Sequence, residues 1–460
     1  MNELNNEKEL LILLNQLNNE YLNILIDLLN KENHRLSYIV IWILINITYI
    51  DLNESLFGEN TNVIINKISL FLGKNKGNKV FTLRGIILLN NITTNNEIIK
   101  EILLNYNIFQ YFVEIYEKYN LDNKFIHNLL KCIGNFIINL NKEYTKQYLL
   151  IIKIIKNELN PFSRIKYLNN YLFYIFNLLN LNSNEINKAI IKEEIYKNLI
   201  NIYQFQDKNN NKIINNNNNF NFIKDANENK KYSYKIKLLI LKILGKLLSF
   251  DEEEELIIQI LIDYGIIDFL KKIINESEND YKIIKNVSFC LSNLCTGNIE
   301  QINKLYNEGI FIKIIKIGEN IYNSLKYNIN LKEDETLELH QTFSEICYVL
   351  ALAILNSLYE KLLPLIEYKN HIIIIFIIEA LNIFQKNIKL VDLCLNSFYR
   401  LICYEKEIEK YNSNIRISEL NISFSEFLDR NGIRSTLEYF INNKNKDISK
   451  IAEKIYNDIY

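Results

Sequence analysis

Apolar residues recur through most of this chain at intervals of three and four, which is the spacing of one face of an α-helix. The segment 281–294 shows the pattern clearly, with apolar side chains at Ile283, Ile284, Val287, Cys290, Leu291 and Leu294. Phe289 and Asn293 lie four residues apart and off this face, so they share a second, more exposed surface. Thr296–Asn298 end this helix. A shorter helix follows up to Asn307, and Gly309 separates it from the next helix. Such a unit cannot bury its own apolar face, so we expect copies beside it.

The same apolar spacing recurs along the chain when Asn293 is taken as a register mark. Equivalent positions are occupied by Asn46, Asn91, Asn135, Asn177 and Lys246. These marks recur about every 40 to 50 residues, apart from one longer interval that contains an Asn-rich stretch. Helical repeats of that period are typical of armadillo or HEAT solenoids.

Short motifs within the repeats are similar to those of one known family. Trp42-Ile-Leu-Ile-Asn46 fits that family's repeated Trp-x-x-x-Asn. The segment SNLCTGNIEQINKLYNEG fits its pattern xSNxxxGxxEQIxxLxxxG, and LGKLLSFDEEEELIIQILIDYG has a similar arrangement. The C-terminal segment FLDRNGIRSTLEYFINNKNKDISKIAEKIYNDIY fits the last repeat of the same family. From about Asn19 to Tyr460 the chain resembles importin-α, the armadillo-repeat cargo adaptors of nuclear import. The resemblance implies an all-α, armadillo-repeat right-handed superhelical solenoid.

We therefore expect residues 1–460 to form a single armadillo-repeat solenoid of about nine repeats. Its expected parts are an N-terminal cap or partial repeat (1–35), repeats (36–205), an Asn-rich disordered insertion (206–232), repeats (233–318), an acidic insertion (327–339), degenerate repeats (340–404) and a C-terminal capping repeat (427–460).

The register positions, one in each repeat and forming a column along the repeats, are the candidate binding site. An asparagine amide can both donate to and accept from an extended peptide backbone, and an aromatic ring one turn earlier can hold a Lys or Arg side chain. The resemblance implies that such a ladder binds nuclear localisation signals. The candidate peptide-binding residues are Trp42, Asn46, Asn91, Asn135, Phe173, Asn177, Glu252, Phe289 and Asn293.

Several positions depart from that pattern and leave other interpretations open. Lys246 replaces the asparagine in one repeat, and Lys131 stands where a ring is expected and would repel a basic side chain. Asparagine is abundant throughout the chain, so part of the column could reflect composition. Trp42 could be a buried core residue, and the acidic run around Glu252 could be an ordinary solvated helix start.

We predict a peptide-binding adaptor that holds basic, localisation-signal-like segments for nucleocytoplasmic transport. The alternative is an armadillo scaffold for protein–protein interaction that has lost coupling to an import receptor. Residues 1–35 contain only Lys8, Lys31 and Arg35 as cations, so the family's basic receptor-binding segment has no counterpart there. An importin-β-type or export receptor is therefore an uncertain partner. We expect a monomer in the cytoplasm and nucleus.

Other classes of function find little support in the sequence. None of the four histidines lies in a metal-binding or catalytic motif, so we expect no enzyme, metal or cofactor. The six cysteines lack CxxC spacing and are expected to be buried hydrophobic residues. The net charge of −1 argues against direct nucleic-acid binding. No apolar run reaches the ~20 residues of a membrane span, so no membrane insertion is expected.

Overall fold

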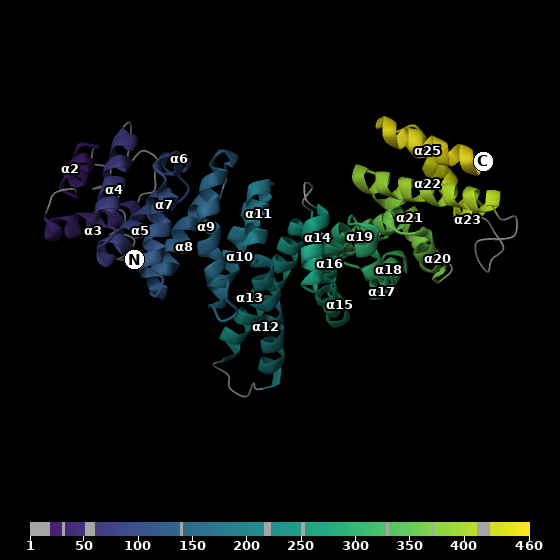
Figure 1. Cartoon of the computed structure of the whole chain (residues 1–460), viewed down its shortest axis with the longest axis horizontal. Helices are drawn as coiled ribbons and strands as arrows, with labels where there is room; N and C mark the ends of the chain where they lie inside the picture. Colours follow the sequence, from purple (N-terminus) through teal and green to yellow (C-terminus); the bar gives the residue numbers. More distant parts are fainter. Residues whose placement is uncertain are drawn as a thin grey trace. The chain divides into compact units, whose positions relative to one another are not determined.

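A computed structural model describes residues 19–29, 33–50, 60–138, 141–215, 222–249, 254–327, 331–369, 371–411 and 424–460 (Figure 1). These residues form helices and short connections, and no β-strand occurs among them. The predicted all-α armadillo-repeat fold is confirmed. The chain divides into two compact units, Met1–Leu239 and Ile240–Tyr460, and the division falls within one long helix.

Unit 1 contains the first four described repeats and most of a fifth. Its helices are α2 (Asn19–Leu29), α3 (His34–Ile50), α4 (Thr61–Asn75), α5 (Lys79–Thr93), α6 (Glu97–Asn105), α7 (Ile108–Tyr119), α8 (Asn123–Ile137), the 3-10 turn η3 (Lys142–Tyr144), α9 (Thr145–Glu158), α10 (Ile165–Asn180), α11 (Asn184–Lys192), α12 (Ile195–Asn215) and the start of α13 (Phe222–Leu248).

Unit 2 continues from the second part of α13 with the same order of helices. They are α14 (Glu254–Asp263), α15 (Ile266–Glu276), α16 (Tyr281–Leu294), α17 (Ile299–Asn307), α18 (Ile310–Tyr327), α19 (Glu333–Asn356), α20 (Tyr359–Glu367), α21 (Ile372–Ile383), α22 (Ile388–Tyr411), α23 (Phe424–Arg430), α24 (Ile433–Ile441) and α25 (Lys446–Ile459).

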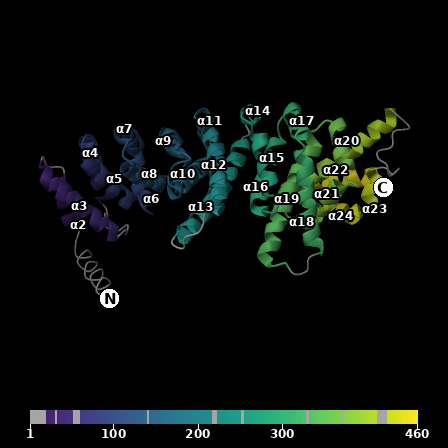
Figure 2. The ribbon, with the colours of Figure 1, turned by 90° about the horizontal axis from the view of Figure 1, so that it is seen from below.

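A complete repeat is a short first helix, a second helix and a third helix, as in α6, α7 and α8. Consecutive third helices pack against one another, α3 on α5, α5 on α8 and α8 on α10 in unit 1, and α16 on α19, α19 on α22 and α22 on α25 in unit 2. In unit 1 the second helices α7 and α9 also pack together. Figure 2 shows these layers, with α4, α7 and α9 along one side and α5, α8 and α10 along the other. Each unit is thus a stack in which the third helices share one face.

The turn between first and second helices is sharp because its residue adopts a left-handed backbone. The residues with positive φ at these junctions are Asn107, Glu194, Gly265, Gly309, Lys369, His371 and Gly432. Glycine adopts this conformation at little cost, whereas a residue with a side chain requires support from its surroundings. The sequence pointed to Gly309 as such a residue, and the structure extends the rule to repeats without glycine.

Asparagine, so frequent in this chain, begins many of its helices. The side chains of Asn78, Asn96 and Asn298 accept hydrogen bonds from backbone N–H groups in the first turns of α5, α6 and α17. At α17 the Gln301 side chain completes a reciprocal capping box. Each cap satisfies donors that the helix itself cannot pair.

The core follows the apolar stripe that the sequence predicted. Val287, Cys290 and Leu291 of α16 are fully buried, and most of their equivalents in the other third helices are buried too. Gly134 of α8 allows a closer approach than any other residue could, because a Cβ there would lie 2.2 Å from the hydroxyl oxygen of Tyr174 in α10. The Tyr174 side chain therefore fills space in the core that Gly134 leaves open by having no side chain.

Parts of the two predicted insertions are described. Residues 206–215 continue α12 and residues 222–232 belong to α13, while residues 216–221 of the Asn-rich stretch lie outside the described residues. Asparagine is only moderately unfavourable in a helix, so α12 and α13 can extend into the two ends of this stretch. Three of the four acids of the predicted insertion 327–339 lie in the first turn of α19, where carboxylates interact favourably with the helix dipole. Residues 1–18 of the predicted N-terminal cap lie outside the described part of the chain.

Candidate functional site

The third helices carry every candidate residue that the structure describes. In unit 1, Trp42 and Asn46 lie on α3, Asn91 on α5, Asn135 on α8, and Phe173 and Asn177 on α10. In unit 2, Phe289 and Asn293 lie on α16. Glu252 lies outside the described residues.

Three of the register asparagines link their helix to the third helix of the preceding repeat. Asn91 Nδ2 donates to the Ile45 carbonyl at 3.1 Å, and Asn135 Nδ2 donates to the Asn90 carbonyl at 2.9 Å. Asn293 Nδ2 donates to the Gly245 carbonyl at 2.9 Å. The acceptor in each case belongs to the residue just before the register position of the previous repeat. These amides consequently share one direction, and part of their donor capacity stabilises the stack.

The other two asparagines make no such link. Asn46 is exposed, and its Nδ2 donates to the Trp42 carbonyl of its own helix at 2.8 Å. Asn177 is half-buried, and within the described structure its amide makes no hydrogen bond to a neighbour. Asn177 thus keeps both its donors and its acceptor available to a ligand.

The three aromatic candidates divide between exposed rings and packing. Trp42 is 55% exposed and Phe173 is 43% exposed, each one turn before its register asparagine. Phe289 is half-buried, and its ring lies so close to Gly245 that an added Cβ there would be 2.3 Å from a ring carbon. Trp42 and Phe173 therefore present rings to solvent, whereas Phe289 contributes to contact between repeats.

Four of the third helices of unit 1 carry charge of a single sign. Helices α3, α5, α8 and α10 contain no Asp or Glu, although they carry Lys and Arg. The acids of this unit lie on other helices and loops, where they form ion pairs such as Lys76–Glu114 between α4 and α7. Exposed Lys131 occupies the position in α8 that Trp42 and Phe173 occupy in their own helices. The face that carries the candidate residues is basic.

A pocket of about 690 Å³ opens beside this face, between the first turns of α8, the end of α9 and the start of α10. Lys124, His127, Glu158, Arg164 and Tyr167 are among its lining residues, and we call it the α8–α10 pocket. The His127 ring stacks on Tyr167 with centroids 3.9 Å apart. The motifs of the sequence do not predict this pocket. The lack of Asp and Glu on α3, α5, α8 and α10 can be read from the sequence and is the signal that points to it.

Local charges and burial affect the titration of two groups in the α8–α10 pocket. Burial lowers the pKa of His127, and the charges of Lys131, Arg164 and Lys166 lower it further. Burial also raises the pKa of Glu158, whose Oε1 accepts a hydrogen bond from the Tyr116 hydroxyl at 3.0 Å. The lowered pKa favours the neutral form of His127. The nearby cations outnumber the one acid of the pocket lining, the partly buried Glu158.

Other reactive groups in the described residues do not assemble into a site. The cysteines are free, and all except the half-buried Cys403 are buried. Burial raises the pKa of thiols such as Cys290 and Cys295, which keeps them protonated. Within the described ranges, no three His, Cys, Asp or Glu side chains are grouped so as to hold a metal ion. Nor does any described helix combine the length and apolar character needed to cross a membrane.

Comparison with solved structures agrees with this architecture. A chain from the structure described as "A conserved phosphorylation switch controls the interaction between cadherin and beta-catenin in vitro and in vivo" aligns over 95% of this chain and 86% of its own length, at 11% identity and a TM-score of 0.56. An engineered protein from the Northeast Structural Genomics Consortium aligns over 96% and 99%, at 13% identity and a TM-score of 0.54. A designed armadillo repeat protein aligns over 66% and 98%, at 13% identity and a TM-score of 0.44.

No protein-family model and no curated protein matches this sequence. The chain is an all-α armadillo-repeat solenoid protein. Its likeness to solved structures lies at identities where only the fold is shared, so its function has to be argued from the third helices themselves.

Proposed function

We propose that this chain is a protein-interaction scaffold that holds an extended segment of a partner protein across the third helices of unit 1. The observation that carries this proposal is the pair of exposed rings, Trp42 and Phe173, each one turn before a register asparagine. Large exposed aromatic side chains are typical of binding surfaces, because their burial by a partner releases considerable free energy.

The amides add the means to hold a peptide backbone. Asn177 has unused donors and an unused acceptor, and Asn46 retains its acceptor oxygen. A backbone in extended conformation offers N–H and C=O groups at regular intervals, which such amides can pair. The linked asparagines Asn91 and Asn135 contribute mainly by fixing the spacing between the helices that carry the rings.

A nuclear-import version of this proposal follows from the resemblance to importin-α. In that version the rings hold Lys or Arg side chains of localisation signals, the protein works in the cytoplasm and nucleus, and a receptor of the importin-β or export type is a further partner. The exposed Trp42–Asn46 pair favours it. The lack of Asp and Glu on α3, α5, α8 and α10 disfavours it, since a basic segment would meet cations there.

A peptide array followed by binding measurements tests the proposal. The full chain is screened against basic, acidic and neutral segments, and the dissociation constant of the best peptide is measured by fluorescence polarisation. We expect Trp42→Ala with Phe173→Ala to weaken binding roughly tenfold, since each ring contact with a cation or apolar group contributes ~0.5–1 kcal/mol.

Leu70→Ala supplies a matched control, because Leu70 is 53% exposed on the second helix α4 of the same unit. It should leave the dissociation constant unchanged. Failure of every class of peptide to bind, or equal binding by the wild type and the double variant, would contradict the proposal.

A further inference from the structure

Two of the cations that line the α8–α10 pocket have no acidic partner in the described structure, as is also true of some exposed lysines elsewhere in unit 1. Elsewhere in the unit, cations such as Lys67, Lys76 and Lys156 form ion pairs with acids of neighbouring helices. Lys124 and Arg164, which line the pocket, are exposed, and the described structure gives neither an ion pair. Because both cations line the same pocket without an acidic partner, an anionic ligand there could pair with two positive charges.

Two further cations extend this cluster towards the register column. Lys131 and Lys166 are exposed and also lack ion pairs in the described structure. Both lie near enough to His127 for their charges to affect its titration. Lys131 is also the α8 equivalent of Trp42 and Phe173, so the cluster and the proposed peptide-binding face are continuous.

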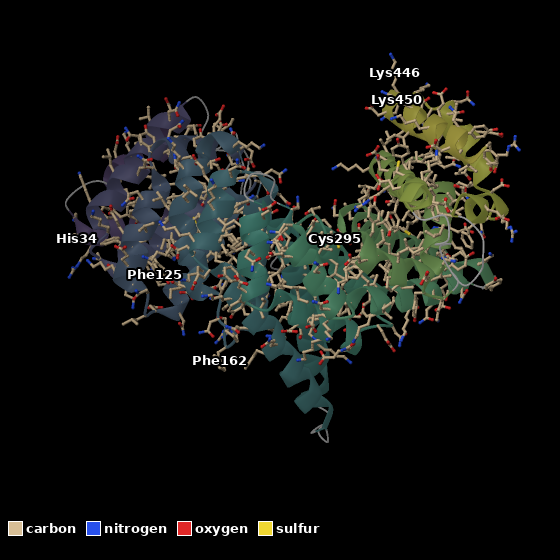
Figure 3. All side chains as sticks on the ribbon, turned by 45° about the vertical axis from the view of Figure 1, so that its right-hand side comes forward. His34, Phe125, Phe162, Cys295, Lys446 and Lys450 are labelled. Atoms are coloured by element: carbon tan, nitrogen blue, oxygen red, sulfur yellow. The ribbon has the colours of Figure 1, made fainter. Side chains whose placement is uncertain are left out.

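The walls of the pocket suit a peptide rather than a simple ion. A volume of about 690 Å³ accommodates several side chains. The stacked rings of His127 and Tyr167 form a flat aromatic wall, and Arg164 lies over the Tyr167 ring at 5.9 Å. Phe162 is 80% exposed and projects from the loop between α9 and α10, where its ring contacts Phe205 at 5.0 Å (Figure 3). Aromatic side chains beside cationic ones favour an acidic segment that also contains apolar residues.

We propose that the α8–α10 pocket binds an acidic segment of a partner protein, with Lys124 and Arg164 holding its anionic groups and Lys131 and Lys166 extending the basic surface. The inference rests on the proposed function, because it names the class of segment that the third helices accept. Glu158 is the opposing charge in the pocket lining, and its hydrogen bond from Tyr116 directs one of its carboxylate oxygens towards α7. The anion therefore lies on the Lys124 and Arg164 side of the pocket.

The experiment uses the full chain and fluorescein-labelled peptides. The probes are an Asp/Glu-rich peptide with interspersed Leu and Tyr, its Lys/Arg-rich counterpart, and a version in which phosphoserine replaces the acids. We expect the acidic peptide to bind more tightly than the basic one, and its affinity to fall as salt is raised. Lys124→Glu with Arg164→Glu should weaken acidic-peptide binding roughly tenfold or more, because like charges would then face each other.

Two further variants separate this site from a general charge effect. Glu158→Gln keeps an acceptor for Tyr116 while removing the opposing charge, so it should strengthen acidic-peptide binding several-fold and weaken basic-peptide binding. Lys146→Glu with Lys153→Glu reverses two exposed charges on α9, outside the pocket lining, and should change binding little. Equal thermal unfolding of the variants shows that they remain folded.

The titration of His127 gives an independent readout. An anion beside the ring stabilises the imidazolium form, so the acidic peptide should raise the pKa of His127 when its ring protons are followed by NMR. His127→Gln assigns the signal. A pKa that stays constant or falls as the acidic peptide saturates the chain would contradict the proposal.

The remaining outcomes distinguish this proposal from the proposed function. Preference for the basic peptide, with loss of binding in Trp42→Ala and none in the charge reversal, would overturn the acidic assignment and leave the scaffold intact. Binding of no peptide would overturn both. Tighter binding of the phosphoserine peptide than of the Asp/Glu-rich peptide would show that the pocket prefers phosphate groups. Equal or weaker binding would show that it prefers carboxylates. Tighter binding of a single-stranded oligonucleotide at Lys124 and Arg164 would overturn the assignment to a protein segment.

Discussion

The dual role of the register asparagines leads to a quantitative prediction at Asn135. Its Nδ2 lies 2.9 Å from the Asn90 carbonyl and 3.1–3.2 Å from the Asn90 side-chain oxygen and the hydroxyls of Thr93 and Thr94. Two N–H groups can make two good hydrogen bonds, each with a net contribution of ~0.5–1.5 kcal/mol. Asn135→Ala removes both bonds between α8 and α5.

Two effects reduce the loss. Thr93 and Thr94 donate their own hydroxyls to the Leu89 and Asn90 carbonyls at 2.7 Å, so no hydroxyl donor is left unpaired by the substitution. Alanine is also the better helix former, by up to about 0.7 kcal/mol. We therefore expect a net destabilisation of about 1 kcal/mol, at the lower end of the range for lost hydrogen bonds.

Asn177→Ala is the matched control, since the residue has the same register position in α10 but makes no hydrogen bond in the described structure. Because long repeat arrays need not unfold in one step, local stability is the better observable. Hydrogen exchange of α8 amides should be about fivefold faster in Asn135→Ala than in the wild type, as expected for about 1 kcal/mol. Asn177→Ala should leave the exchange of α10 amides unchanged or slower. Equal behaviour of the two variants would refute the assignment of Asn135 as a link between repeats.

Two further stability predictions follow from the packing. Gly134→Ala should lower the thermal midpoint, with a cost of ~1–3 kcal/mol, because the new Cβ would collide with Tyr174. When Tyr174→Ala is already present, adding Gly134→Ala should cost much less, because the collision is gone. Burial raises the pKa of Glu345 to about 6, against a smaller opposing effect of Lys285. The raised value means that ionisation of Glu345 destabilises the fold above about pH 6, so Glu345→Gln should stabilise the chain by about 1–2 kcal/mol at neutral pH and very little below about pH 4. An equal effect in urea titrations at both pH values would count against a buried carboxyl.

The repeat architecture was predictable because burial imposes a period on the sequence. Each third helix must bury one face against its neighbours, and that requirement places apolar residues such as Val287 and Leu291 at equivalent positions in repeat after repeat. The register asparagines were found for the same reason, as they lie at one phase of that stripe. Gly309 marked a junction because only a left-handed residue permits the turn.

The roles of individual side chains were less predictable, because they depend on contacts between residues far apart in the sequence. Asn91 and Asn177 share a register position, yet the first donates to the preceding helix and the second does not. Phe173 and Phe289 likewise share a position, but the missing side chain of Gly245 draws the Phe289 ring into the packing. Composition alone also suggested disorder in the Asn-rich stretch, where the described residues extend α12 and α13.

The pocket lay outside the sequence analysis because its residues come from two repeats and a loop. His127, Glu158 and Arg164 are not close in sequence, and only the stacking of α8, α9 and α10 brings them together. The lack of Asp and Glu on α3, α5, α8 and α10 can be read from the sequence, whereas the resemblance to importin-α predicts basic ligands. The pocket shifts the expected ligand towards the opposite charge.

The most direct test of a binding face on the third helices is photo-crosslinking with the tightest peptide from the array, carrying a photoreactive residue at successive positions. Mass spectrometry of the crosslinked full chain then identifies the contacted segments. Crosslinks confined to α3, α5, α8, α10 and the α9–α10 loop are the predicted result. Crosslinks concentrated on α4, α6, α7 and α11, on the first and second helices of the same repeats, would contradict the account.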